Sequence, residues 1–102
     1  MVIYFVSKKL EKQLDPANVS RYYGGLARGV INRLSELANA KSLEEVPSNP
    51  PPKRHKLQRQ DHCWAVSVNK NYRLIFQACG NFDPNDLTTI TEICIYSIED
   101  YH

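Results

Sequence analysis

Apolar positions in residues 1–40 change from a short continuous run to helical spacing. Residues 2–6 (VIYFV) are β-branched or aromatic, which predicts a buried first strand. Ser7 stands where a helix N-cap is expected before KKLEKQL, and Pro16 suits the first position of a second helical piece. Gly24 weakens the helix that follows, so we expect it to begin late or to bend there. The apolar stripe of this helix consists of Leu26, Ala27, Val30, Ile31, Leu34, Leu37 and Ala38.

The second half of the chain changes from helical to strand periodicity. Ser42 and Glu45 have the spacing of a capping box, which predicts a one-turn helix. The prolines of residues 47–52 then force an extended connector. Strands are predicted at residues 54–58, 63–69, 72–78 and 89–98, with a tight turn at 69–71 and a polar loop at 79–88.

The last predicted strand, residues 89–98, is apolar enough to be a central strand of the sheet. Simple alternation places Ile93, Ile95 and Ser97 on the same face of it. The order of elements predicts an α+β fold with an N-terminal strand. Two or three helices pack on one face of a mostly antiparallel sheet of four or five strands. We expect residues 1–102 to form a single domain.

Composition indicates a small globular protein of a reducing compartment. The chain has 102 residues, of which 42% are hydrophobic and 24% are charged. No apolar run approaches the roughly 20 residues of a membrane span, and the N-terminal run is too short for a secretory signal, so we expect a cytoplasmic protein without membrane contact. Cys63, Cys79 and Cys94 form no C-x-x-C pair, which predicts buried thiols. A zinc site completed by His55 or His62 would match no common spacing.

Positive charge is concentrated in one stretch, although the net charge of the chain is only +2. Between residues 53 and 73 the only acidic residue is Asp61. A basic patch of this kind is typical of a protein that grips a polyanion such as RNA. The alternative is a solvated charged face without a ligand. The six cations are Lys53, Arg54, Lys56, Arg59, Lys70 and Arg73.

The chain ends with Asp100-Tyr101-His102, directly after the last predicted strand. Metal-free cleavage of RNA needs a base for the ribose 2′-hydroxyl, cations for the phosphate and an acid for the leaving oxygen. His55 and His102 suit the proton transfers, because the pKa of a histidine side chain ordinarily lies near neutrality. Arg73 suits phosphate binding, and Tyr101 suits stacking on a base. No carboxylate cluster for magnesium is visible, so we expect neither a metal nor another cofactor.

Several of these residues have a purely structural alternative. His102 could be part of a frayed chain end, as terminal residues often are. Arg73 could form an ion pair with Glu92. His62, beside Cys63 and Trp64, is typical of a surface residue at a strand edge.

An ordered set of motifs covers about two-thirds of the chain and resembles the HigB-type plasmid-maintenance killer proteins of the RelE-like toxin superfamily. The helical half matches only in pattern, through Arg33, Leu34 and Leu37. The matching motifs are Ser42-Leu43, Pro51-Pro52, His55 with Leu57, Trp64 with Val66, Val68 and Asn69, Tyr72-Arg73-Leu74 with Phe76, and Asp100-Tyr101-His102.

The resemblance implies the toxin of a toxin–antitoxin pair, a ribosome-dependent mRNA endonuclease that cuts the codon exposed in the A site of the small subunit. It also implies a HigA-like antitoxin of the helix-turn-helix type as partner. The pair would bind operator DNA only through this antitoxin. His55 would be a general base or phosphate contact, and Arg73 would bind the phosphate. Asp100, Tyr101 and His102 would complete the active site. The remaining RNA contacts would come from Lys53, Arg54, Arg59 and Lys70.

One position departs from the family pattern, because Gln58 stands where a catalytic lysine is usual. Either Lys56 or Arg59 replaces this cation, and we expect Lys56, which shares a strand face with Gln58. Otherwise cleavage is weakened, and the protein is a non-cleaving ribosome- or RNA-binding member of the same fold. A third interpretation is an interaction domain whose basic patch binds an acidic protein partner.

Overall fold

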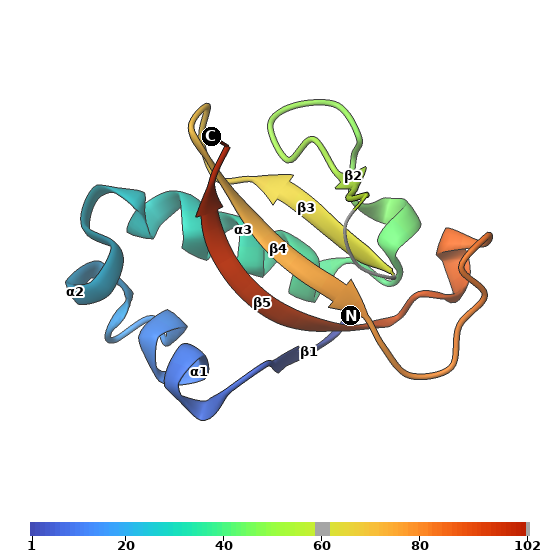
Figure 1. The fold of residues 1–102 in the computed structure, drawn as a ribbon, viewed down its shortest axis with the longest axis horizontal. Coiled ribbons are helices and arrows are strands. Elements are labelled where there is room, and N and C mark those ends of the chain that lie inside the picture. Colours follow the sequence, from blue (N-terminus) through green and yellow to red (C-terminus); the bar gives the residue numbers. More distant parts are fainter. Residues whose placement is uncertain (59–61, 102) are drawn as a thin grey trace.

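A computed structural model describes residues 1–58 and 62–101 of the chain (Figure 1). Arg59 and His102 lie outside the described residues, so the roles expected for them stay predictions. No helix in the described ranges is long and apolar enough to cross a membrane. The elements are β1 (Val2–Phe5), α1 (Lys8–Leu14), α2 (Val19–Tyr23), the 3-10 turn η1 (Gly24–Leu26), α3 (Ala27–Asn39), η2 (Leu43–Glu45), β2 (His55–Lys56), β3 (Cys63–Ser67), β4 (Tyr72–Ala78), η3 (Leu87–Thr89) and β5 (Glu92–Asp100).

The sheet contains five strands in the order β1-β5-β4-β3-β2. The strands from β2 to β5 pair antiparallel, whereas β1 pairs in parallel with β5. The helices pack against one face of this sheet, with α3 behind β3, β4 and β5 (Figure 1). The predicted α+β fold is therefore confirmed. The prediction that the first strand is buried is wrong, because β1 is an edge strand. Only Ile3 and Phe5 pack against the core, while Val2 and Tyr4 are 51% and 49% exposed.

Local signals decide where the first two helices begin. Ser7 caps α1 as predicted, since its Oγ accepts a hydrogen bond from the backbone N–H of Leu10 at 3.1 Å. Pro16 does not open α2, which is a correction to the prediction. It lies in a turn in which the Asp15 carboxylate accepts a hydrogen bond from the backbone N–H of Ala17 at 2.8 Å, and α2 starts only after this turn.

The long helix is interrupted at the glycines, as the sequence predicts. Gly24 has a φ of +52°, and η1 separates α2 from α3 there. In α3, Val30 is fully buried, but Ala38, the last residue of the predicted stripe, is exposed. A Cβ placed on Gly29 would lie 2.9 Å from both Cγ1 and the carbonyl oxygen of Val68. The missing side chain therefore allows α3 to approach the end of β3 closely.

The two faces of the sheet are packed differently. The face against the helices carries the large core, and the opposite face, which we call the open face, carries a smaller buried cluster. The alternation predicted for residues 63–69 is confirmed, since Trp64 and Val66 belong to the large core and Ala65 to the smaller cluster. The large core includes Trp64, Val66, Leu74, Phe76, Ile93 and Ile95, and the open-face cluster consists of Leu57, Cys63, Ala65 and Ile75, with Tyr96 packed against it.

A β-bulge in β5 reverses the alternation of its side chains. Ser97 lies opposite Ile75, whereas Phe76, the next residue of β4, lies opposite Ile95, so Tyr96 is an extra residue. Directly opposed residues share a face of the sheet, and Ser97 therefore lies on the open face with Ile75. The expected placement of Ser97 on the face of Ile95 is wrong. From the bulge to the end of β5, the odd-numbered residues face away from the helices.

Three shorter predictions have mixed outcomes. The one-turn helix η2 forms, but Ser42 does not cap it; instead the Glu45 carboxylate accepts a hydrogen bond from the backbone N–H of Lys41 at 2.8 Å. Strand β2 contains two residues instead of the predicted residues 54–58. The turn between β3 and β4 is confirmed, with the Asn69 side chain accepting two backbone N–H groups at 2.8 Å each.

Candidate functional site

Strands β3, β4 and β5 bring polar side chains together on the open face, near the end of the chain. Ser67 lies opposite Arg73, and Arg73 lies opposite Glu99. The backbone N–H of Ser67 donates to the carbonyl of Pro52 at 2.7 Å, on the side away from β4. Ser67 and Arg73 therefore form a non-hydrogen-bonded pair, the kind in which cross-strand side chains lie closest together.

Tyr101 is fixed beside this pair by both its backbone and its side chain. Its backbone N–H donates to the carbonyl of Asn71 at 2.9 Å. Its hydroxyl lies 2.5 Å from Ser67 Oγ, and the guanidinium carbon of Arg73 lies 5.3 Å from the centre of its ring. That distance is within the range of a cation–π interaction. Arg73 and Tyr101, two of the predicted site residues, therefore lie in contact with each other.

Arg73 has an unsatisfied donor at this position. Its Nε is buried, and no group in the described part of the chain accepts a hydrogen bond from it. The alternative pairing with Glu92 is not formed, since the Glu92 carboxylate accepts a hydrogen bond from the Tyr4 hydroxyl at 3.2 Å at the other end of β5. A buried donor without an acceptor is unfavourable, so this position of Arg73 is maintained at a cost in stability.

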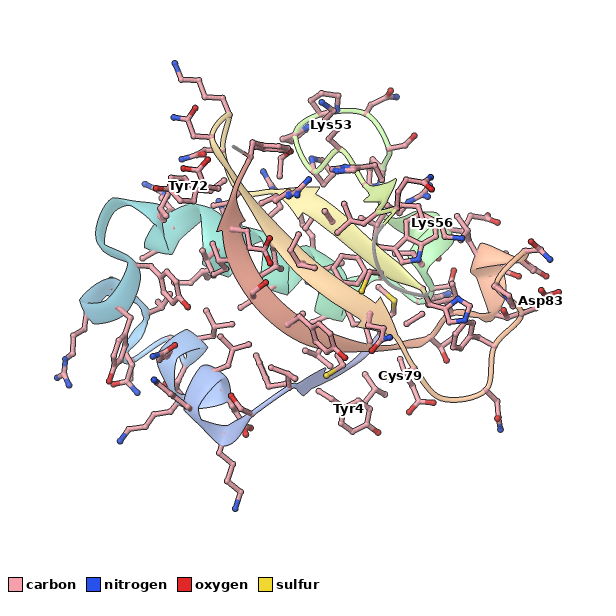
Figure 2. The ribbon with its side chains drawn as sticks, in the orientation of Figure 1. Tyr4, Lys53, Lys56, Tyr72, Cys79 and Asp83 are labelled. Atoms are coloured by element: carbon pink, nitrogen blue, oxygen red, sulfur yellow. The ribbon has the colours of Figure 1, made fainter. Side chains whose placement is uncertain are left out.

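A cleft of about 560 Å³ adjoins Tyr101. It lies between the proline-rich connector and the turn from β3 to β4, and Figure 2 shows Lys53 on the connector near the end of the chain. Three cations line it, from three separate segments of the chain, which makes it electropositive. The polar residues that line it are Arg33, Lys53, Lys70, Ser67, Asn69 and Tyr101.

His55 lies on the open face, one row of residue pairs away from Arg73. It is opposite Ala65, which belongs to the open-face cluster. Its Nδ1 is 2.9 Å from the carbonyl oxygen of Lys53. A carbonyl can only accept, so this hydrogen bond places a proton on Nδ1 and leaves the Nε2 of a neutral ring as the basic nitrogen.

Two other predicted cations lie elsewhere. Lys56 is opposite Trp64, on the helix-covered side of the sheet, so it does not share a face with His55. The Arg54 guanidinium lies 5.6 Å from the centre of a Trp64 ring, and its Nε donates to the carbonyl of Val46 at 2.7 Å. Burial lowers the pKa of Arg54, partly offset by the negative charge of Glu44. Arg54 is thus engaged in packing on Trp64, on the helix-covered face of the sheet.

Of the C-terminal triplet, the structure describes Asp100 and Tyr101, which do not share a face of β5. Asp100 lies opposite Tyr72, which packs against the helix-covered core, so Asp100 is on the other face of β5 from Glu99. It is exposed. Of the triplet, Tyr101 alone is placed beside Arg73 in the described residues.

Comparisons with known proteins identify the fold. No protein-family model and no curated protein matches this chain. Among solved structures, it is similar to the YoeB dimer from Staphylococcus aureus, with 17% identity, a TM-score of 0.58, and coverage of 100% of this chain and 97% of the other. It is also similar to a YoeB/ParE toxin from Agrobacterium tumefaciens, with 13% identity, a TM-score of 0.56 and coverage of 100% of both chains. The chain has the fold of these toxins.

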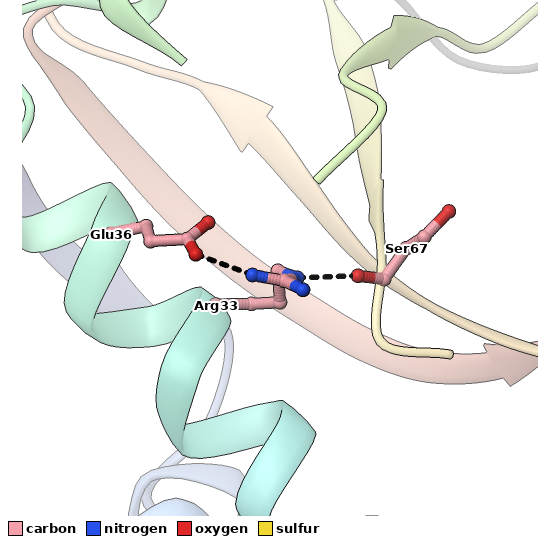
Figure 3. Close-up of polar contacts among 3 residues, drawn as sticks. All are labelled: Arg33, Glu36 and Ser67. Carbon is pink, nitrogen blue, oxygen red and sulfur yellow. Dashed lines mark hydrogen bonds and ion pairs between the residues drawn. The ribbon is translucent and has the colours of Figure 1, made fainter. Parts of the chain in front are cut away.

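In this YoeB/ParE-like fold, sequence reasoning missed a group of residues that links helix α3 to the site. Arg33 Nε donates to the carbonyl of Ser67 at 2.7 Å, and its Nη1 forms an ion pair with Glu36 at 2.5 Å (Figure 3). Two signals were available, since Arg33 is a charged residue on the edge of the apolar stripe and one of the helical positions that match the family pattern, but neither of them indicated its contact with Ser67. Ser67 gave no signal, because small polar residues are common in strands that alternate.

The three cysteines and the candidate metal ligands are spread over the described residues and form no common cluster. No group of three His, Cys, Asp or Glu side chains in the described ranges could hold a metal ion. None of the three cysteines forms a disulfide, but only Cys63 is buried; Cys79 and Cys94 are half-buried, contrary to the expectation of buried thiols. Burial, followed by the negative charge of Glu92, raises the pKa of the Cys79 thiol and so makes it less reactive. His62 is not a simple surface residue, since its half-buried ring packs edge-on against Phe82 at 5.0 Å.

Proposed function

We propose that this protein is the toxin of a type II toxin–antitoxin pair, of the HigB type, and that it cleaves mRNA on the ribosome without a metal. Two independent observations support this proposal. The fold is that of proteins described as YoeB and YoeB/ParE toxins. The ordered motifs in residues 42–76 and the closing triplet resemble the HigB-type proteins.

The observation that carries the proposal is the state of Arg73. Its Nε is buried without an acceptor, and its guanidinium lies over the ring of Tyr101, whose hydroxyl is held by Ser67. This cation–π contact restrains the guanidinium before a ligand arrives. A planar fork held in this way is suited to a phosphate, whose charge increases in the pentacoordinate transition state.

The reaction is an attack of the ribose 2′-oxygen on the neighbouring phosphorus. The P–O5′ bond breaks, a 2′,3′-cyclic phosphate forms, and the leaving 5′-oxygen takes up a proton. His55 Nε2 is the proposed acceptor of the 2′-hydroxyl proton, and Arg73 neutralises the phosphate oxygens. His102 is the proposed acid, by the family resemblance. Asp100 is proposed from the same resemblance alone.

Binding of RNA is proposed to involve Lys53 and Lys70, which line the electropositive cleft beside Tyr101. Arg59 keeps its proposed RNA-binding role from the sequence. Arg54 is a weaker candidate, because its guanidinium is used to pack on Trp64. Phosphate contacts of this kind are expected to make ribosome binding strongly salt-dependent. The proposed partners are the ribosomal A site, mRNA and a helix-turn-helix antitoxin in the cytoplasm.

A second candidate, a ribosome-binding protein that does not cleave, is favoured by one observation. Gln58 replaces the usual lysine, and Lys56 lies on the helix-covered side of the sheet and not beside Arg73. If no other cation serves, the transition state lacks part of its charge stabilisation.

Primer extension on an mRNA bound to purified ribosomes tests the proposal. The wild-type protein is compared with Arg73→Gln and His102→Ala, and with Arg21→Gln, an exposed arginine of α2, as the charge-matched control. We expect discrete new ends within codons for the wild type and the control, and at least about 100-fold slower cleavage for the two site variants.

The outcomes separate the candidates. Ribosome binding without new ends in any variant would replace cleavage with the non-cleaving interpretation. No affinity for ribosomes or RNA at any salt concentration would favour an acidic protein partner instead. Lys56→Gln and Arg59→Gln, measured in the same assay, show which cation replaces the lysine absent at position 58.

A further inference from the structure

The end of strand β3 depends on a contact from helix α3. The pairing of β3 with β2 ends at Ala65, so the backbone of Ser67 in β3 has no partner in β2. The Ser67 N–H donates to the Pro52 carbonyl at 2.7 Å, and its carbonyl accepts from Arg33 Nε at the same distance. A carbonyl at this position would otherwise have no partner in the sheet. Arg33 thus donates the hydrogen bond that a neighbouring strand would otherwise supply.

The same serine holds the aromatic ring of the site. Ser67 Oγ is 2.5 Å from the Tyr101 hydroxyl, and the Tyr101 ring lies under the Arg73 guanidinium. Arg33 therefore acts on Arg73 through two intermediate residues, without a contact to it. The Arg33 side chain is 11% exposed, and its far end is anchored to Glu36 (Figure 3).

We infer that Arg33 is a positioning residue, which fixes Ser67 and thereby holds Tyr101 under Arg73. The inference rests on the proposed function, because it assigns Arg33 a part in RNA cleavage. Arginine suits this task because its planar fork can donate to a carbonyl on one side and to a carboxylate on the other at once. The single ammonium group of lysine cannot span the two acceptors in this geometry.

A positioning role predicts a loss in the chemical step more than in binding. Displacement of a catalytic group by about 1 Å can lower a rate about 100-fold. For Arg33→Gln we expect the single-turnover cleavage rate at saturating ribosome complex to fall about 10- to 100-fold. The concentration that gives half the maximal rate is expected to stay within about twofold. Arg28→Gln, on the exposed side of the same helix, is the charge-matched control and is expected to resemble the wild type.

A structural readout that does not depend on cleavage is provided by 19F NMR of protein labelled with 3-fluorotyrosine. The chain has six tyrosines, and the Tyr101 resonance is assigned by its absence from Tyr101→Phe. We expect Arg33→Gln to shift this resonance and Arg28→Gln to leave it unchanged. Arg33→Lys keeps the net charge and serves as the second variant in case Arg33→Gln does not fold. It is expected to show the same shift of the resonance and the same loss of rate.

These measurements keep the inference and the proposed function distinguishable. If the wild type does not cleave, the proposed function fails, and the Tyr101 resonance alone decides on the contact from Arg33. If Arg33→Gln folds, cleaves like Arg28→Gln and leaves the resonance unchanged, the inference is overturned. It is also overturned if Arg33→Lys restores the rate, or if Arg33→Gln raises the half-saturating concentration and reduces the salt dependence, because Arg33 would then be a phosphate contact.

Discussion

Replacement of Gly29 by alanine tests the packing that brings α3 to the end of β3. A Cβ at this position would lie 2.9 Å from Val68 Cγ1 and 2.9 Å from the Val68 carbonyl oxygen, closer than Cβ atoms approach such neighbours in real structures. The Cγ1 contact could be relieved by rotation of the valine side chain. The oxygen belongs to the backbone, and the Val68 N–H is itself bonded to the Tyr72 carbonyl at 2.9 Å. The helix or the hairpin therefore has to move.

Two effects of opposite sign determine the magnitude. Alanine is favoured over glycine inside a helix by about 1 kcal/mol. An added methyl group in a packed site destabilises by about 1–3 kcal/mol, and a backbone neighbour that cannot rotate away places Gly29 in the upper half of that range. We expect a net loss of about 1–2 kcal/mol in the free energy of unfolding. For a domain of this size, each kcal/mol lowers Tm by about 4–8 °C.

Urea denaturation of the wild type, Gly29→Ala and Gly25→Ala measures this difference. Gly25 is the matched control, because a Cβ there would meet nothing within 4 Å and its φ is not positive. Gly25→Ala is expected to be neutral or slightly stabilising. If Gly29→Ala is as stable as Gly25→Ala, with an unchanged denaturant slope, α3 does not approach Val68 as described. The Arg33 contact with Ser67, one helical turn further on, would then be in question as well.

Three further outcomes follow from individual side chains. The hydrogen bond to Glu92, followed by its charge, raises the pKa of Tyr4, so the difference between the absorbance titrations of the wild type and Tyr4→Phe should have its midpoint above 10.0. Because the pKa of Tyr4 is raised in the folded protein, the stability from this contact is present below pH 10 and is lost as the pH rises through the folded pKa. A titration midpoint at or below 10.0 would contradict the contact. Cys63 is fully buried, so native protein should be alkylated at the other two thiols only, and equal modification of all three without denaturant would refute its burial. Arg54→Ala should shift the fluorescence emission of Trp64, the single tryptophan, to longer wavelength and lower the free energy of unfolding by about 0.5–1 kcal/mol. The salt dependence of RNA binding should not change. Unchanged emission would show that Arg54 does not cover the ring.

The sequence predicted those features that depend on local periodicity. The apolar run of residues 2–6, the helical stripe and the alternation in residues 63–69 each gave an element of the right type. These patterns are reliable because burial of one face requires a period of 2 in strands and about 3.6 in helices. Ser7 was also predictable, since a capping side chain acts only on the next few residues.

Features that depend on pairing between distant segments could not be predicted in this way. The bulge at Tyr96 is an example, because nothing in the alternation of β5 shows that one residue is skipped. The bulge nevertheless decides where the chain end is placed. Without it, Glu99 and Tyr101 would lie on the face of Ile95, against the helices, and Arg73 would have no aromatic ring beside it. The contact of Arg33 with Ser67 likewise joins residues 34 positions apart.

The pairing of β2 also changes which cation is the better candidate to replace the lysine absent at position 58. His55 lies opposite Ala65, and Leu57 belongs to the open-face cluster with Cys63, so these two residues face the side that carries Arg73. Lys56 lies between them and faces the helices. For Lys56 to reach the scissile phosphate, its ammonium group would have to pass around the edge of the sheet. The pairing of β2 therefore counts against Lys56 as the replacement for this lysine, and the Arg59→Gln variant tests the other candidate.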